Sequence, residues 1–173
     1  MGLLGVCIQC LHRLVEGGVI ILAVIQITLF EILTKMGEHL KALRLPYSSA
    51  RELFRRMVFN VAVRNQDDHT KNISFLMDED GRWRLSPAYD MGYAYNPHGG
   101  WTAMHQMSVN GKFDAVTRED LLSFAAANGI KDAGEVIGQV CDAMSLWPRM
   151  ARECGVPEEM IAGIEKNMCL VAD

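Results

Sequence analysis

The polar stretch RNQDDHTKN, residues 64–72, limits what this chain can fold into more than any other feature, because it separates two apolar segments of different periodicity. The segment before it repeats its apolar residues at helical spacing, at Leu53, Phe54, Met57, Val58 and Val61. Ser49 and Glu52 have the spacing of a capping box. We therefore expect a helix that starts there and runs directly into the polar stretch.

The segment after the polar stretch predicts a β-hairpin. Residues 73–77, ISFLM, have the composition of a short strand, and DEDG at 78–81 is typical of a turn. The returning strand, residues 82–85, should place Trp83 and Leu85 on one face. Ser86-Pro87 ends it, and the loop AYDMGYAYNPHGGW, rich in glycine and aromatic residues, follows.

The C-terminal third predicts three helices. Thr117 with Asp120 should cap the first, which stops before Gly129. Pro148 should end the second and Pro157 should open the third. The second helix carries an apolar row of Val136, Val140, Met144 and Trp147. We therefore predict a mainly α, α+β fold with one small hairpin in its middle.

Composition narrows the class of protein. At 173 residues, half of them apolar, the chain has the size of one folded domain. The net charge is −4, whereas a general nucleic-acid binder needs a basic surface. We therefore expect no direct nucleic-acid binding. The 5 cysteines are an odd number and are scattered, which favours reduced thiols and a cytoplasmic location.

The uncharged run at residues 17–30, GGVIILAVIQITLF, needs separate treatment. It is shorter than the roughly 20 residues with which a helix crosses a bilayer. It also lacks the cleavage site of a signal peptide. We expect a buried helix or strand here, and we expect no membrane attachment.

The polar stretch could hold the chemistry of phosphoryl transfer. Asp67 and Asn72 are five positions apart, and the hairpin should return the chain so that Asp90 lies close to Asn72. Asn72 and Asp90 could hold Mg²⁺, which takes few protein ligands and shares the others with phosphates. Asp67 could orient or deprotonate an attacking hydroxyl. Protein-kinase catalytic loops have the same spacing, and that spacing selects Asp67 over Asp68.

Two other interpretations stay open at this point. An Asp-Asp-His turn is often simply solvated, and a D-x-x-x-x-N pattern is common by chance. A metal-dependent phosphohydrolase could be built on Asp67, Asp68 and His69. That class usually gathers further Asp and His ligands from separate motifs, and this chain offers few.

Two motifs together carry a resemblance to a known family. The sequence NQDDHTKNISFL, followed by WRLSPAYDM, resembles the C-terminal lobe of HipA-like kinases, the toxins of bacterial toxin–antitoxin pairs. The likeness is close from about Leu45 to Gly111. We therefore divide the chain into an atypical apolar segment, residues 1–44, and a HipA-like C-terminal kinase lobe, residues 45–173.

The resemblance implies a role for each residue that matches the motif. Asp67 corresponds to the catalytic aspartate, and Asn72 and Asp90 correspond to the Mg²⁺ ligands that also bind ATP. His69 and Lys71 would shape the catalytic loop, and Lys71 would also lie near the phosphates. For His69 a hydrogen-bonded structural role is the alternative. The loop after Asp90 would either face the substrate or pack against its own aromatic residues, which include Tyr93, Tyr95 and Trp101.

The family also implies partners. Its members are ATP- and Mg²⁺-dependent serine/threonine kinases, with aminoacyl-tRNA synthetases among their substrates, and a helix-turn-helix antitoxin holds them. A kinase also needs a smaller lobe with a glycine-rich phosphate loop and a strand lysine, and residues 1–44 have neither. We therefore expect a C-lobe that is inactive alone or works with a separate N-lobe. The alternative is a non-catalytic toxin fragment that binds an antitoxin or such a lobe.

Overall fold

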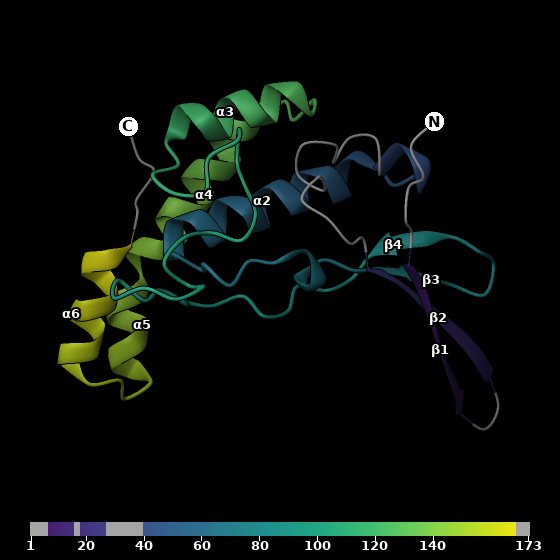
Figure 1. Cartoon of the computed structure of the whole chain (residues 1–173), viewed down its shortest axis with the longest axis horizontal. Helices are drawn as coiled ribbons and strands as arrows, with labels where there is room; N and C mark the ends of the chain where they lie inside the picture. The colour runs from purple at the N-terminus through teal and green to yellow at the C-terminus, as the bar shows by residue number, and fades with distance from the viewer. Residues whose placement is uncertain (1–6, 16–17, 27–39, 169–173) are drawn as a thin grey trace.

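A computed structural model of the chain describes residues 7–15, 18–26 and 40–168. These residues form helices and two small antiparallel hairpins, which confirms the α+β fold class (Figure 1). The elements are β1 (Cys7–Val15), β2 (Gly18–Gln26), α2 (Tyr47–Val63), β3 (Phe75–Met77), β4 (Trp83–Leu85), α3 (Arg118–Ala127), α4 (Ala133–Ser145), α5 (Trp147–Glu153) and α6 (Glu158–Asn167).

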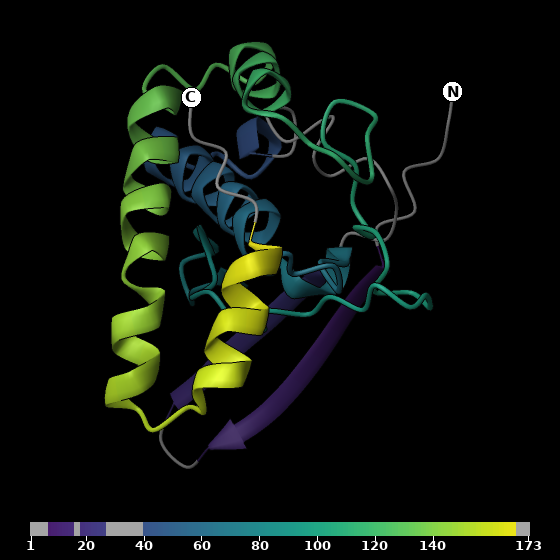
Figure 2. The same ribbon diagram turned by 90° about the vertical axis from the view of Figure 1, so that its left-hand side faces the viewer.

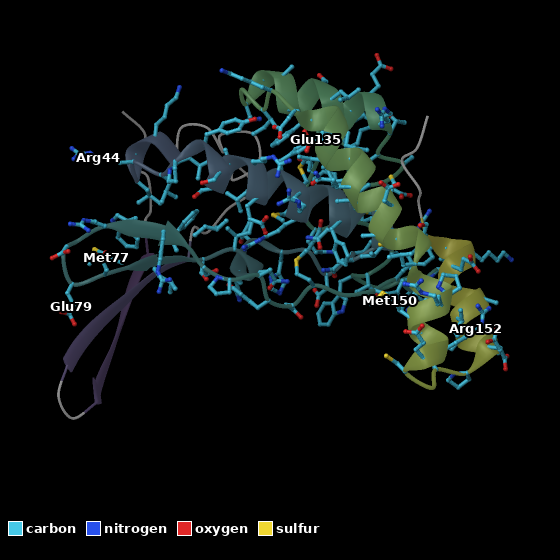
Figure 3. All side chains as sticks on the ribbon, turned by 180° about the vertical axis from the view of Figure 1, so that it is seen from behind. Arg44, Met77, Glu79, Glu135, Met150 and Arg152 are labelled. Atoms are coloured by element: carbon cyan, nitrogen blue, oxygen red, sulfur yellow. The ribbon has the colours of Figure 1, made fainter. Side chains whose placement is uncertain are left out.

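Helix α2 crosses the middle of the molecule, between the hairpins at one end and α5 with α6 at the other (Figure 1). Helices α4 and α5 follow one another along one side, with α6 beside α5 (Figure 2). From behind, Met77 and Glu79 lie at the hairpin end, and Met150 and Arg152 lie at the opposite end (Figure 3). Most of the segment between α2 and α3, which includes β3 and β4, lies below α2 in Figure 1, and its last part rises to α3.

Helix α2 buries the apolar face that its periodicity predicts. Leu53, Phe54, Met57, Val58 and Val61 are all buried. The ring of Phe54 stacks on that of Phe124 in α3, with 6.4 Å between centroids and 6° between planes. Val136 and Ile137 of α4 are fully buried in the same core. This core fixes the axis of α2, and therefore the point at which the polar stretch begins.

The start of α2 differs from the prediction. The helix begins at Tyr47 after Pro46, and no side chain caps it. The Ser49 N–H already donates to the Pro46 carbonyl at 2.9 Å, so Ser49 lies inside the first turn and cannot be the N-cap. Glu52 instead accepts hydrogen bonds from Arg55 and Arg56. The capping-box prediction was wrong because the extended backbone of Pro46 starts the helix earlier.

The central hairpin agrees with its prediction. Phe75 pairs with Leu85 and Met77 with Trp83. Trp83 and Leu85 are both half-buried, whereas Arg84 between them is exposed, which confirms the shared face. Strand β2 pairs with β1 and runs beside β3. The apolar run is therefore a strand from Gly18 to Gln26, and its last residues, 27–30, lie outside the described part of the chain.

The C-terminal helices agree except at one boundary. Thr117 and Asp120 form the predicted capping box, α3 ends at Ala127, and Pro157 precedes α6. Pro148, however, does not end α4, which stops at Ser145. Pro148 lies in the first turn of α5 instead, where its missing N–H costs no hydrogen bond. Among the described residues, no helix combines the length and apolarity needed to cross a membrane.

Candidate active site

The polar stretch begins with a sharp change of direction. Arg64 caps the end of α2 in the left-handed conformation, with φ 53°, and its guanidinium lies over the Tyr95 ring at 4.5 Å. Asn65 then forms a parallel bridge with Ala94, and the Gln66 N–H donates to the Ala94 carbonyl at 3.0 Å. The start of the stretch is therefore attached to the loop that follows Asp90.

The two adjacent aspartates have different environments. Asp68 is buried, and its carboxylate contacts Nδ1 of buried His105 at 2.9 Å. It also accepts the Gln106 N–H at 2.7 Å. Asp67 is only half-buried, and its carboxylate has no hydrogen-bond partner among the described residues. Asp68 therefore ties the stretch to the 105–106 segment, while the carboxylate of Asp67 is left available.

Asn72 and Lys71 lie at the far end of the stretch, in a short 3₁₀ turn over Thr70–Asn72. The Asn72 side-chain N–H donates to the Asp67 carbonyl at 3.1 Å, so the amide oxygen of Asn72 is left for another ligand. The Lys71 carbonyl accepts the Tyr89 hydroxyl at 2.6 Å, and the Lys71 side chain is exposed. Tyr89 thus connects this turn to the residue before Asp90.

The position of Asp90 is fixed through hydrogen bonds to its backbone and to the backbone of the preceding residues. Its φ is 55°, a left-handed conformation that is uncommon for non-glycine residues, although aspartate tolerates it better than most. The Asn65 side-chain N–H donates to the Asp90 carbonyl at 3.1 Å and also to Oδ1 of Asn60 in α2 at 3.0 Å. At the start of the segment, Arg56 of α2 donates to the Ser86 carbonyl at 2.8 Å. Helix α2 therefore fixes both ends of the turn that presents the Asp90 carboxylate.

These backbone contacts bring three side chains together. One ligand atom each from Asp67, His69 and Asp90 lie within 4.8 Å of one another. Nδ1 of His69 is buried and has no hydrogen-bond partner among the described residues. Two carboxylates and an imidazole at this separation fit a single divalent cation. Asn72 is joined to the same loop through its bond to Asp67.

Some residues that shape the site carried no local signal in the sequence. His105 lies 37 positions from Asp68, and Asn65 and Asn60 act through the hydrogen bonds of a single side chain.

The loop after Asp90 is partly packed against the domain and partly exposed. Tyr95 packs against Arg64, and the Tyr93 hydroxyl accepts the side-chain N–H of Asn167 in α6 at 3.0 Å. Trp101, by contrast, is 82% exposed.

Comparison with protein families decides the relationship. The sequence model of the HipA-like C-terminal domain matches residues 27–165, most of the chain. The chain belongs to this family. The match covers both motifs on which the resemblance rested, which confirms that expectation. No curated protein sequence matches the chain.

A solved structure shares the fold of this chain. The chain is similar to a structure of the HipA, HipB and operator DNA complex of a toxin–antitoxin system from Shewanella oneidensis MR-1, with a TM-score of 0.61 and 19% identity. The likeness covers 80% of this chain but 34% of the other, so this chain spans about a third of that protein's length. That complex contains DNA, so the prediction of no direct nucleic-acid contact is not borne out.

Proposed function

We propose that this chain carries the metal- and hydroxyl-binding half of a HipA-type kinase site, which directs transfer of the γ-phosphoryl group of ATP to a protein serine or threonine. The observation that carries the proposal is the convergence of Asp67, His69 and Asp90 within 4.8 Å. Membership of the HipA-like C-terminal domain family supports it, since the three residues that converge all belong to the motifs of the resemblance. We also propose that the helical part of the chain has the fold of a kinase C-terminal lobe.

Each residue has a distinct role in the proposed reaction. Asp90 and the amide oxygen of Asn72 would hold Mg²⁺, which neutralises charge on the transferred phosphoryl group when it is bound. Asp67 would accept the hydrogen of the substrate hydroxyl and direct its oxygen. His69 has a buried Nδ1 without a partner and would complete the polar wall beside Asp67. Lys71 is exposed at the rim, where its charge would attract phosphate.

A second candidate function is a non-catalytic one, in which the chain binds a separate N-lobe or a helix-turn-helix antitoxin. The HipA of the matched structure is in a complex with HipB, which supports an antitoxin as the partner. An aminoacyl-tRNA synthetase is the proposed substrate class if transfer occurs.

The two proposed functions differ in whether the γ-phosphoryl group of bound ATP is transferred. Calorimetry with MgATP, followed by a radiolabel transfer assay on protein substrates, separates binding from chemistry. We expect Asp90→Asn to abolish MgATP binding, and Asp67→Asn to keep binding while transfer falls by about 10²–10⁴-fold. Transfer that survives Asp67→Asn would contradict the kinase assignment. MgATP binding without transfer in the parent chain would instead favour the binding fragment.

A further inference from the structure

The peptide group between Asp67 and Asp68 connects several residues of the candidate site. Its carbonyl accepts two hydrogen bonds, from the His69 N–H at 2.9 Å and from the Asn72 side-chain N–H at 3.1 Å. The second bond sets the direction of the Asn72 amide, and therefore where the oxygen of that amide can point. Because a peptide group is planar and rigid, its carbonyl keeps this direction only while the backbone of Asp68 is held in place.

Asp68 is held by a segment that lies 37 positions away in the sequence. Its Oδ2 contacts Nδ1 of His105 at 2.9 Å, and its Oδ1 accepts the Gln106 N–H at 2.7 Å. Asp68 and His105 are each only 5% exposed. A carboxylate at this depth is stable only with such partners, so its side chain has one allowed direction. His105 therefore fixes Asp68 from the side opposite to its neighbours in the polar stretch.

The backbone around His105 is itself firmly attached to the domain. The His105 N–H donates to the Phe113 carbonyl at 2.9 Å. Val109 and Lys112 exchange two backbone hydrogen bonds, each of 2.9 Å, which closes the segment into a tight turn. Met107 and Val109 are buried in the hydrophobic core. His105 is therefore a fixed point from which the position of Asp68 can be set.

We propose that His105 is a positioning residue for the cation site, which acts through Asp68 to keep the amide oxygen of Asn72 directed at the cation. The inference rests on the proposed function, in which Asn72 and Asp90 hold that cation. His105 takes no part in the ligand cluster of Asp67, His69 and Asp90. An imidazole is neutral or positive, so its removal cannot lower the affinity for a cation through charge. A lower affinity would have to come from the geometry of the site.

Two substitutions of His105 separate positioning from packing. His105→Leu keeps a branched apolar side chain and removes the nitrogen that contacts Asp68, whereas His105→Asn keeps a nitrogen donor at the same place along the side chain. In calorimetric titration of the full chain with Mn²⁺, we expect His105→Leu to bind about tenfold more weakly and His105→Asn to stay within about threefold of the parent. Ile161→Val trims a buried side chain of α6 and is the control for a general loss of packing. Its affinity for Mn²⁺ should equal that of the parent.

Hydrogen exchange followed by NMR reports the same role without a cation. The His69 amide, which donates to the Asp67 carbonyl, should exchange at least about tenfold faster in His105→Leu than in the parent, while the amides of α2 keep their rates. If His105→Leu does not fold, the double variant with Asp68→Leu replaces both polar partners by apolar side chains, a change that costs less than the loss of one partner. Its His69 amide should also exchange faster.

The outcomes distinguish this inference from the proposed function. If the parent and His105→Leu bound Mn²⁺ equally, or if the His69 amide exchanged at the parental rate in the variants, only the role of His105 would be overturned. Equal weakening in His105→Leu and His105→Asn would overturn it too, because the retained nitrogen would then have no effect. Absence of Mn²⁺ binding in the parent would overturn the proposed function and the cation role of His105 together.

Discussion

The turn around Asp120 and the loop around Asp67 both present aspartates, and they treat the carboxylate in opposite ways. Asp120 is buried and accepts hydrogen bonds from the Lys112 ammonium at 2.8 Å, the Thr117 hydroxyl at 2.7 Å and the Thr117 N–H at 2.9 Å. The Lys112 ammonium and the Thr117 N–H hold the pKa of the Asp120 carboxyl well below its usual range. Asp67 and Asp90 have no such partners among the described residues, although their carboxylates lie close together.

The number of protein hydrogen-bond donors separates carboxylates that stabilise the fold from carboxylates that are available to a ligand. A carboxylate that is saturated by protein donors contributes to folding and has no capacity left for a ligand. Two adjacent carboxylates without donors repel one another, so folding gains nothing from keeping them together. Asp68 belongs with Asp120, because His105 and the Gln106 N–H occupy both of its oxygens. Asp68 and Asp120 therefore stabilise the fold, whereas the carboxylates of Asp67 and Asp90 are left available.

The largest expected effect is on the Asp120 turn. Asp120→Ala removes the capping box of α3 and leaves Lys112 and the Thr117 N–H without their acceptor. We expect the free energy of unfolding to fall by about 3–4 kcal/mol. Urea denaturation followed by circular dichroism measures it, with exposed Asp114→Ala as the control, expected within about 0.5 kcal/mol of the parent chain. Equal losses in the two variants would remove Asp120 from the structural class.

Asp68→Ala tests the second member of that class. The change leaves His105 and the Gln106 N–H unpaired in a buried region, so we expect a loss of about 2–3 kcal/mol. The neighbouring variant Asp67→Ala is the matched control. It should cost less than about 1 kcal/mol, because no protein hydrogen bond to its carboxylate is lost. If Asp67→Ala were the more destabilising of the two, the proposed division between the aspartates would be wrong.

Acid should reveal the Asp120 interaction. Because its pKa is lowered in the folded state, the stability it contributes is present above its unfolded value of 3.8 and is lost as the pH falls below that value. The urea midpoint of the parent chain should therefore fall more steeply than that of Asp120→Asn between pH 4.5 and pH 2.5. Subtracting one curve from the other removes the contribution of the other carboxylates, which is the same in both proteins. Parallel curves would mean that Asp120 is not held ionised by Lys112.

The smallest effect on stability concerns the available pair. Asp67→Asn removes one of two carboxylates that lie within 4.8 Å, without losing a donor. The free energy of unfolding should stay the same or rise by up to about 1 kcal/mol, because repulsion is relieved. Urea denaturation in the presence of a chelator measures this without bound cations. A loss of more than about 1 kcal/mol would show that the Asp67 carboxylate has a structural partner.

Local patterns predicted most of the fold. The buried face of α2, the central hairpin and the capping box of α3 each depend on residues a few positions apart, whose spacing the sequence displays directly. The errors occurred where one residue type has two uses. Pro148 can end a helix or begin one, and only the position of α5 against α6, where the indole N–H of Trp147 donates to the Ile161 carbonyl at 3.3 Å, shows which applies.

Spacing in the sequence suggested which residues form the candidate site, but it could not reveal the residues that hold them in place. The five-residue spacing selected Asp67 over Asp68, and that choice stays a prediction; in the structure the Asp68 carboxylate is bonded to His105 and the Gln106 N–H. The reason that Asp68 is unavailable lies 37 positions away, at His105, and no spacing rule could reveal it. The left-handed turn at Asp90 was likewise hidden, because the Asn65 bond that supports it crosses 25 positions of the chain.

Cation binding tests the central claim most directly. Calorimetric titration of the full chain with Mn²⁺, a spectroscopic substitute for Mg²⁺ that also accepts imidazole, should show one site. Asp90→Asn should weaken that site by at least about tenfold, and Asp120→Asn should leave it unchanged. Absence of the site in the parent chain, or equal affinity in the parent and in Asp90→Asn, would contradict the account.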